Sequence, residues 1–170
     1  MSQVLKDTNT WLQAGTTVAM ATVVLGGEGA QLKAGKQIAL ADDGKGSGSL
    51  GHDLLDEIVS EQSRQTLNDG EPRVLTFPAA GDAQVFVERV DDRAEIPRLV
   101  RALEGGRACA WVTDLGTGLA SVVSKDGYAQ GSLGLDDCAL STIGALIEEG
   151  ASACLETGFE SLLFVRTYQP

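Results

Sequence analysis

The sequence contains few of the residues from which common functional sites are built. Its 170 residues include three cysteines, one histidine and two tryptophans, and only 5% are aromatic. One histidine argues against a protein-only zinc site of the usual ligand sets. Three cysteines without a CxxC pair argue against a disulfide framework and favour a reducing compartment. We therefore expect a cytoplasmic protein with a largely aliphatic core.

Positive charge is also scarce. The chain has 13 lysine and arginine residues against 24 aspartate and glutamate residues, which gives a formal net charge of −11 at pH 7. Binding to the phosphate backbone of nucleic acids and docking on anionic membranes both need basic residues in excess. No apolar run reaches the roughly 18 residues of a membrane span, and residues 1–15 lack the apolar stretch of a signal peptide. We expect neither nucleic acid nor membrane as a partner.

What the sequence does contain is an internal repeat. The tetrapeptide GSLG occurs at residues 48–51 and again at 131–134; we call these segments the first and the second GSLG loop. Each follows an Asp-Gly pair, Asp43-Gly44 or Asp126-Gly127, and the two copies align at a constant offset of 83 residues. A repeat of this kind predicts two similar structural units.

Upstream of the Asp-Gly pairs the repeat continues at an offset of 91 residues, so the first copy carries eight additional residues around positions 26–36. The residues that match at this offset are Gly15, Ala19 and Thr22 in the first copy, and Gly106, Ala110 and Thr113 in the second.

The same series of elements is predicted in each copy. A short amphipathic helix ends at a glycine, and a continuous apolar strand follows (residues 17–24 or 108–112). A second strand then enters a hairpin at the Asp-Gly pair, which suits such turns. After each GSLG loop an amphipathic helix leads to a final apolar strand, at 85–90 or 162–168.

For the helix after each GSLG loop we predict an apolar stripe and a terminal glycine. The stripe residues are Leu54, Leu55, Ile58, Val59 and Leu67 before Gly70, and Leu140, Ile143, Leu146, Ile147 and Leu155 before Gly158. Residues 74–84 look like an extra strand and loop of the first copy.

These elements predict an α+β protein. Two pseudo-symmetric helix–strand–hairpin–helix–strand halves, about 1–90 and 91–170, are expected to form one domain with a mixed sheet. A half of about 80 residues buries too little surface to be more than marginally stable alone.

Two interpretations of the GSLG loops remain open. Small residues between a strand and a helix let backbone amides face a ligand, and the helix N-terminus favours an anion there. Alternatively, the glycines only make a tight corner, and Asp53 or Asp136 caps the helix. The first interpretation predicts a binding surface of Gly48, Ser49, Gly51, Gly131, Ser132 and Gly134, with His52 as an exposed neighbour that contacts the anion weakly.

The chain resembles the N-terminal region of the XdhC/CoxI family, which are accessory proteins for xanthine dehydrogenase, carbon monoxide dehydrogenase and related molybdenum hydroxylases. The resemblance rests on the helix–glycine–ATVV opening, Lys36 after small residues, the Asp-Gly turn followed by Gly-Ser, the next helix and the closing VFVE at 85–88. It covers most of the chain, because the second copy resembles the second segment of that region.

The resemblance implies a cytoplasmic maturation factor without catalytic turnover of its own. Such proteins bind molybdenum cofactor, a pterin with a phosphate tail, help its sulfuration and pass it to the apo-hydroxylase. The implied partners are a molybdenum hydroxylase subunit or a cysteine desulfurase, and a homo-oligomer is left open. Lys36 joins the predicted cofactor-binding residues on this ground, although a lysine at a strand edge can also serve only to prevent aggregation.

The sequence departs from the family pattern at three places. Leu54 stands where many members have a cysteine, and Asp56 stands for a glutamate. The stretch 77–84 lacks the Cys-Gly-Gly of many members, and the chain stops at Pro170 without the C-terminal Rossmann-like domain. A non-catalytic scaffold or oligomerisation module that has lost ligand binding is therefore the alternative function.

An enzyme is the third option, and it would depend on Cys138 or His52. Cys138 lies near a predicted helix start, which can lower a thiol pKa, but two neighbouring aspartates oppose that shift. Cys109 and Cys154 are expected in the core. No nucleophile–base–acid set is visible around the serines of the loops, so no catalytic residue is assigned.

Overall fold

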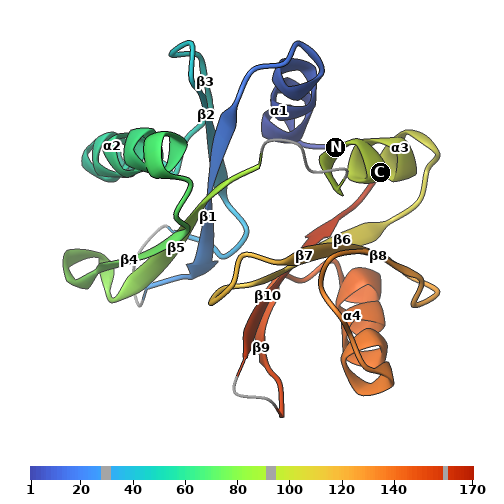
Figure 1. Cartoon of the computed structure of the whole chain (residues 1–170). Coiled ribbons are helices and arrows are strands. Elements are labelled where there is room, and N and C mark those ends of the chain that lie inside the picture. Colours follow the sequence, from blue (N-terminus) through green and yellow to red (C-terminus); the bar gives the residue numbers. More distant parts are fainter. Residues whose placement is uncertain (28–31, 91–94, 159–160) are drawn as a thin grey trace. The chain divides into compact units, whose positions relative to one another are not determined.

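The computed structural model describes residues 1–27, 32–90, 95–158 and 161–170. The chain divides into two compact units, Ser2–Arg93 and Ala94–Pro170, which we call the N-terminal unit and the C-terminal unit. Within the described ranges there are four α-helices, one short 3-10 helix and two five-stranded sheets, one sheet in each unit (Figure 1). The predicted α+β class and the two similar halves are confirmed. That both halves make up one domain stays a prediction.

The N-terminal unit contains a helix, three strands, a second helix and two further strands. In chain order these are α1 (Gln3–Gln13), β1 (Val18–Leu25), β2 (Gln37–Ala41), β3 (Gly46–Gly48), α2 (Asp53–Asp69), β4 (Arg73–Phe77), the 3-10 helix (Pro78–Ala80) and β5 (Ala83–Arg89). The strands are ordered β3-β2-β1-β5-β4.

The C-terminal unit repeats this series. Its elements are α3 (Glu95–Glu104), β6 (Cys109–Asp114), β7 (Ala120–Ser124), β8 (Ala129–Gly131), α4 (Asp137–Glu149), β9 (Ala153–Glu156) and β10 (Leu162–Tyr168). The strand order β8-β7-β6-β10-β9 is that of the first sheet, element for element.

Strand register confirms the repeat alignment residue by residue. Val18 lies opposite Ala41 in the β1–β2 pair, and Cys109 lies opposite Ser124 in the β6–β7 pair. These pairs differ by 91 and 83 residues, the two offsets found in the sequence. The additional residues of the first copy fall around 26–36, of which 28–31 lie outside the described ranges.

The predicted mixed sheet is wrong. Every neighbouring strand pair in both sheets is antiparallel. In each unit the first strand lies in the centre, between a hairpin partner and the final strand, and the chain runs back along it on both sides. An unbroken apolar strand such as β1 is usual in parallel sheets, but here it is apolar because residues 18–24 are all buried.

Helices cover opposite faces of each sheet, α1 and α2 in the N-terminal unit and α3 and α4 in the C-terminal unit (Figure 1). The core under α2 contains Ala21, Val23, Leu32, Ile38, Leu50, Leu55, Val59, Phe77, Ala83, Val85 and Val87. The core under α4 contains Ala110, Val112, Val123, Ile143, Ile147, Leu163 and Val165. None of the helices in the described ranges is both long and apolar enough to cross a membrane.

The buried stripe of α2 differs from the predicted one. Leu55 and Val59 are buried as expected, but Leu54 is 59% exposed and Ile58 is 39% exposed. Polar residues complete the buried face of the helix, because Ser63 donates a hydrogen bond from its hydroxyl to the Val59 carbonyl and so can be buried without an unsatisfied group. The helix ends at Gly70, as predicted.

The helix after the second GSLG loop is shorter than predicted. It ends at Glu149 with Gly150 as its C-cap, and Leu155 belongs to β9 rather than to the helix. Because β9 pairs with β10 as β4 pairs with β5, β4 is a member of the repeat and not an extra strand of the first copy.

Candidate functional site

The two GSLG loops occupy equivalent places in the fold. The first connects β3 to α2 and the second connects β8 to α4. The glycine that opens each loop ends an edge strand, with Gly48 opposite Ile38 and Gly131 opposite Ser121. The two loops therefore share a position in the topology, as the repeat predicted.

A carboxylate from α2 holds the first loop in place. Asp56 accepts a hydrogen bond from the Ser49 hydroxyl at 2.5 Å and another from the Leu50 amide at 2.8 Å. The Gly51 amide donates to the Ser49 hydroxyl oxygen at 2.8 Å. The donors of the first loop are thus bound by a carboxylate of the chain itself.

Lys36 contacts the same loop from the segment before β2. Its ammonium group donates to the Leu50 carbonyl at 3.0 Å. The ammonium lies so near Gly51 that a Cβ built there would be 3.1 Å from it. His52 is exposed and takes the N-cap position of α2 without a capping hydrogen bond from its side chain. Five predicted residues, Lys36, Gly48, Ser49, Gly51 and His52, are thus brought to one corner.

The second loop is held by a different set of groups. The Ser132 amide donates to the Ala120 carbonyl at 2.8 Å. The Ser121 hydroxyl accepts from the Leu133 amide at 3.1 Å and donates to the Leu133 carbonyl at 3.0 Å. At the position of Lys36 the second copy has Leu119, which is 46% exposed.

Two acidic residues lie near the second loop. A small cavity of about 120 Å³ beside Gly134 is lined by Asp114 and Asp136. Asp136 also caps α4, because its carboxylate accepts from the Ala139 amide at 2.7 Å. A carboxylate at a helix N-terminus takes the place that an anionic ligand would need.

The hydrogen bonds of the loops do not favour the first interpretation, in which free backbone amides face a ligand. The amides of Leu50, Gly51, Ser132 and Leu133 all donate to groups of the chain itself. The capping interpretation holds for Asp136 but not for the first copy, where His52 precedes the helix. Sequence reasoning missed the role of Asp56; an acid seven residues after the loop serine was the available signal. The assignment of the loop residues to cofactor binding stays a prediction.

The three cysteines differ in accessibility. Cys109 is buried, Cys154 is half-buried and Cys138 is exposed at the start of α4. Burial raises the pKa of the Cys109 thiol to about 11, against a smaller lowering by Arg107, and burial also raises the pKa of Cys154. Only a thiolate reacts readily, so the buried thiols are poor nucleophiles.

A labelling experiment tests this order. We expect maleimide at pH 7.5 to modify Cys138 in the folded protein at least 100-fold faster than Cys109, because Cys138 is exposed whereas burial both shields the Cys109 thiol and raises its pKa. Because the pKa of Cys109 is raised to about 11, its thiolate fraction stays small until the pH approaches that value. Peptide mass spectrometry after timed quenching gives both rates, and denatured protein is the control. Equal rates in the folded protein would contradict the burial of Cys109.

Comparison with known families supports the resemblance seen in the sequence. Residues 11–78 match the model of the XdhC and CoxI family. The match runs from the end of α1 to the start of the 3-10 helix, and includes Lys36 and the first GSLG loop. It confirms the resemblance for the N-terminal part of the chain.

A solved structure shares the fold over the whole chain. The matched structure is that of a protein described as a xanthine dehydrogenase from Bacillus halodurans. Its chain and this chain superpose with a TM-score of 0.72 at 18% sequence identity. The superposition covers 100% of this chain and 53% of the other, so this chain spans about half the length of that protein. The comparison with curated proteins returned no match.

Proposed function

We propose that this chain, whose N-terminal part matches the XdhC and CoxI family, is an accessory factor in the maturation of a molybdenum hydroxylase. The observation that carries the proposal is the family match, because it contains the whole first corner with Lys36, Ser49 and Gly51. In this proposal the factor binds molybdenum cofactor or the apo-enzyme, and has no catalytic turnover of its own.

The first corner fits the phosphate tail of such a cofactor only in part. The Leu50 and Gly51 amides are already used within the chain, so they do not cradle a phosphate. An ammonium group has three donors, and Lys36 uses one of them on the Leu50 carbonyl. Lys36 is therefore the group that would hold the phosphate, and the exposed His52, which directly follows Gly51, is the next candidate. Sulfuration through a family cysteine is not proposed, because that position holds Leu54.

A second function, a scaffold that contacts the hydroxylase without cofactor, is favoured by a separate observation. Leu54 and Ile58 are exposed by 59% and 39%, and they lie four residues apart on α2, next to the first loop. Residues at this spacing share one face of a helix. Exposed apolar side chains that lie together are typical of protein-binding surfaces.

Co-expression with a molybdenum hydroxylase separates the two functions. If the chain binds cofactor, the purified protein carries pterin, measured by fluorescence after oxidation, and Lys36→Met lowers the pterin content at least fivefold. If it is a scaffold, pterin is absent and Leu54→Asp lowers co-purification of the hydroxylase at least fivefold. Leu119→Asp is the matched control, because Leu119 is 46% exposed but lies in the other unit. The proposal would be contradicted if the purified protein carried no pterin and no hydroxylase co-purified with it.

A further inference from the structure

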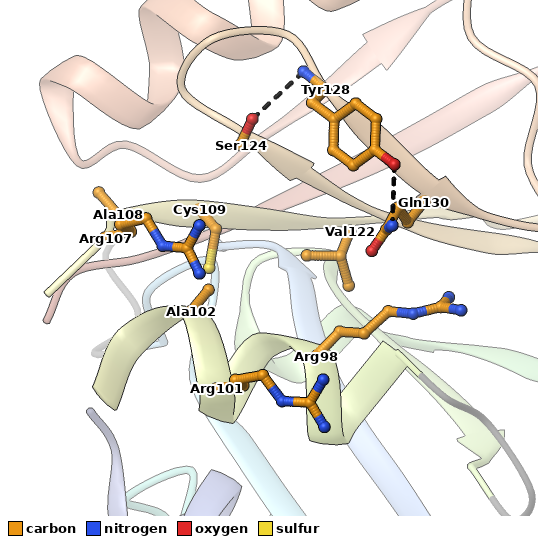
Figure 2. A pocket seen from close by; sticks show the side chains of 10 residues that line it. All are labelled: Arg98, Arg101, Ala102, Arg107, Ala108, Cys109, Val122, Ser124, Tyr128 and Gln130. Carbon is orange, nitrogen blue, oxygen red and sulfur yellow. Dashed lines mark hydrogen bonds between the residues drawn. The ribbon is translucent and has the colours of Figure 1, made fainter. Parts of the chain in front are cut away.

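A cavity of about 280 Å³ lies within the C-terminal unit, between α3 and the β7–β8 hairpin (Figure 2). Arginines form one side of it: Arg98 and Arg101 come from α3, and Arg107 comes from the turn before β6. Tyr128 and Gln130 form the opposite side (Figure 2). The residues that line this cavity lie outside the family match and play no part in the proposed function.

The three guanidinium groups have no hydrogen-bond or ion-pair partner among the residues that the structure describes. Among the described residues, the cavity lining also contains no aspartate or glutamate. Acidic residues are common in this chain, which has a net charge of −11 and eight arginines, so an arginine could easily be paired with a carboxylate. Arginine side chains form strong paired hydrogen bonds with phosphate and carboxylate groups. Arg101 and Arg107 are exposed and Arg98 is half-buried, so water can solvate them. It is the gathering of three arginines around one cavity, with no acid among its described lining residues, that points to an anionic ligand.

The repeat shows that this site belongs to the second copy only. At the offset of 91 residues Arg98 corresponds to Asp7, and at the offset of 83 Gln130 corresponds to Ser47. In the first copy the Ser47 hydroxyl donates to the Asp7 carboxylate at 2.5 Å, and α1 packs directly on β3. In the second copy α3 packs on β6 and β7, and the cavity lies beside the edge strand β8.

The other differences between the copies add space and positive charge. Trp11 of the first copy corresponds to Ala102, a much smaller residue that lines the cavity. Two threonines of the first copy, Thr10 and Thr16, correspond to Arg101 and Arg107. All three cavity arginines thus replace an acidic or a neutral residue.

The arrangement of the lining side chains limits which ligands fit the cavity (Figure 2). The three guanidinium groups lie apart from one another along the cavity rather than around a single point. Tyr128 is 66% exposed, and its hydroxyl accepts a hydrogen bond from the Gln130 side-chain amide at 3.0 Å, which helps to orient the ring. A ligand with several anionic groups and a flat part would use both features, because aromatic rings stack on each other. We propose that this cavity binds a small ligand with two linked phosphate groups, such as a nucleoside diphosphate.

Isothermal titration calorimetry on the full chain tests the site, with inorganic pyrophosphate, ADP and orthophosphate as probes. Pyrophosphate and ADP are expected to bind at least tenfold more tightly than orthophosphate. Arg98→Gln and Arg107→Gln should each weaken pyrophosphate binding at least tenfold. The matched control is Arg64→Gln, because Arg64 is an exposed arginine of α2 that pairs with Glu61; it should leave binding unchanged.

A second variant tests the cavity without changing its charge. Ala102→Trp restores the residue of the first copy and should abolish binding while the circular dichroism spectrum stays that of the folded protein. Binding of orthophosphate as tight as that of pyrophosphate would overturn the proposal, and so would unchanged binding by the arginine variants. An octaglutamate peptide that binds more tightly than pyrophosphate would also overturn it, and would point to an acidic protein segment as the occupant.

Discussion

Alanine at position 48 is expected to lower the free energy of unfolding of the N-terminal unit by about 3 kcal/mol or more. A Cβ at this position would lie 2.4 Å from the Gln37 carbonyl oxygen and 2.6 Å from a methyl group of Val4. The backbone there has a φ of +88°, which side-chain-bearing residues rarely adopt. The strand backbone and α1 would both have to move. Urea denaturation gives the change in stability.

The repeat provides an internal test of this prediction. Gly131 is the counterpart of Gly48, and its Cβ would lie 2.3 Å from the Ala120 carbonyl oxygen. Gly131→Ala should therefore destabilise the C-terminal unit by a similar amount. Gly134→Ala is the control, because nothing lies within 4 Å of a Cβ there. An effect of Gly134→Ala equal to that of Gly131→Ala would contradict the role of close approach.

Tryptophan fluorescence can follow each unit separately. The chain has two tryptophans, Trp11 in α1 and Trp111 in β6, so each unit contains one. In a Trp111→Phe background the signal reports the N-terminal unit, and in a Trp11→Phe background it reports the C-terminal unit. A variant that acts locally shifts the transition of its own unit only.

Removal of the Asp56 carboxylate is expected to destabilise the first GSLG loop and the N-terminal unit with it. Asp56→Ala leaves the Leu50 amide and the Ser49 hydroxyl without their acceptor. Hydrogen bonds to a charged group contribute about 1.5 to 3 kcal/mol each, so we expect a loss of about 2 to 3 kcal/mol after water replaces part of the contact. Residues 48–51 should also exchange their amide hydrogens faster, which hydrogen exchange with mass spectrometry measures.

Asp53→Ala is the matched control for this prediction. Asp53 is an exposed acid in the same helical turn, and its carboxylate accepts no hydrogen bond from the described residues. It shares the favourable position near the helix N-terminus, so its removal measures the general effect of charge there, about 0.3 to 1 kcal/mol. If both variants lose equal stability, the hydrogen bonds of Asp56 do not fix the loop.

Much of the fold could be predicted from the sequence because its signals are local. The Asp-Gly pairs mark the two hairpins, and the unbroken apolar run of residues 17–24 marks the central strand β1. The repeat offsets found in the sequence match the residues that lie opposite each other in equivalent strand pairs of the two units. Strand direction was not local information, and the sheets proved antiparallel where a mixed sheet was expected.

The errors in the elements have one cause, which is that short patterns fit more than one structure. Residues 153–156 continue the apolar spacing of the helix before them, and this spacing wrongly predicts helix for β9. In the structure Gly150 ends α4. By helical spacing in the sequence, Leu54 and Ile58 belong to the apolar stripe of α2, but in the structure both side chains are exposed. Helical periodicity gives the spacing of residues, while the sheet decides which face is covered.

The candidate site was only partly predictable. Glycines and the helix start placed the corners correctly, but the acceptors of their amides come from other turns and strands, such as Asp56 and Ser121. The sequence alone does not mark the arginine cavity, because its lining comes from α3, the turn before β6 and the β7–β8 hairpin. Arg98 is an ordinary surface residue in the sequence, and it becomes informative once Asp7 is known to occupy the same place.

The two GSLG loops have the same position in the fold and different anchors. A lysine and an aspartate secure the first, whereas a serine hydroxyl and a strand carbonyl secure the second. Mutational data from one half therefore cannot be transferred to the other by alignment, even where the letters are identical. If one GSLG loop were grafted into another protein, the group that accepts its amide hydrogen bonds would have to be grafted with it. The two units are therefore best treated as two separate engineering scaffolds.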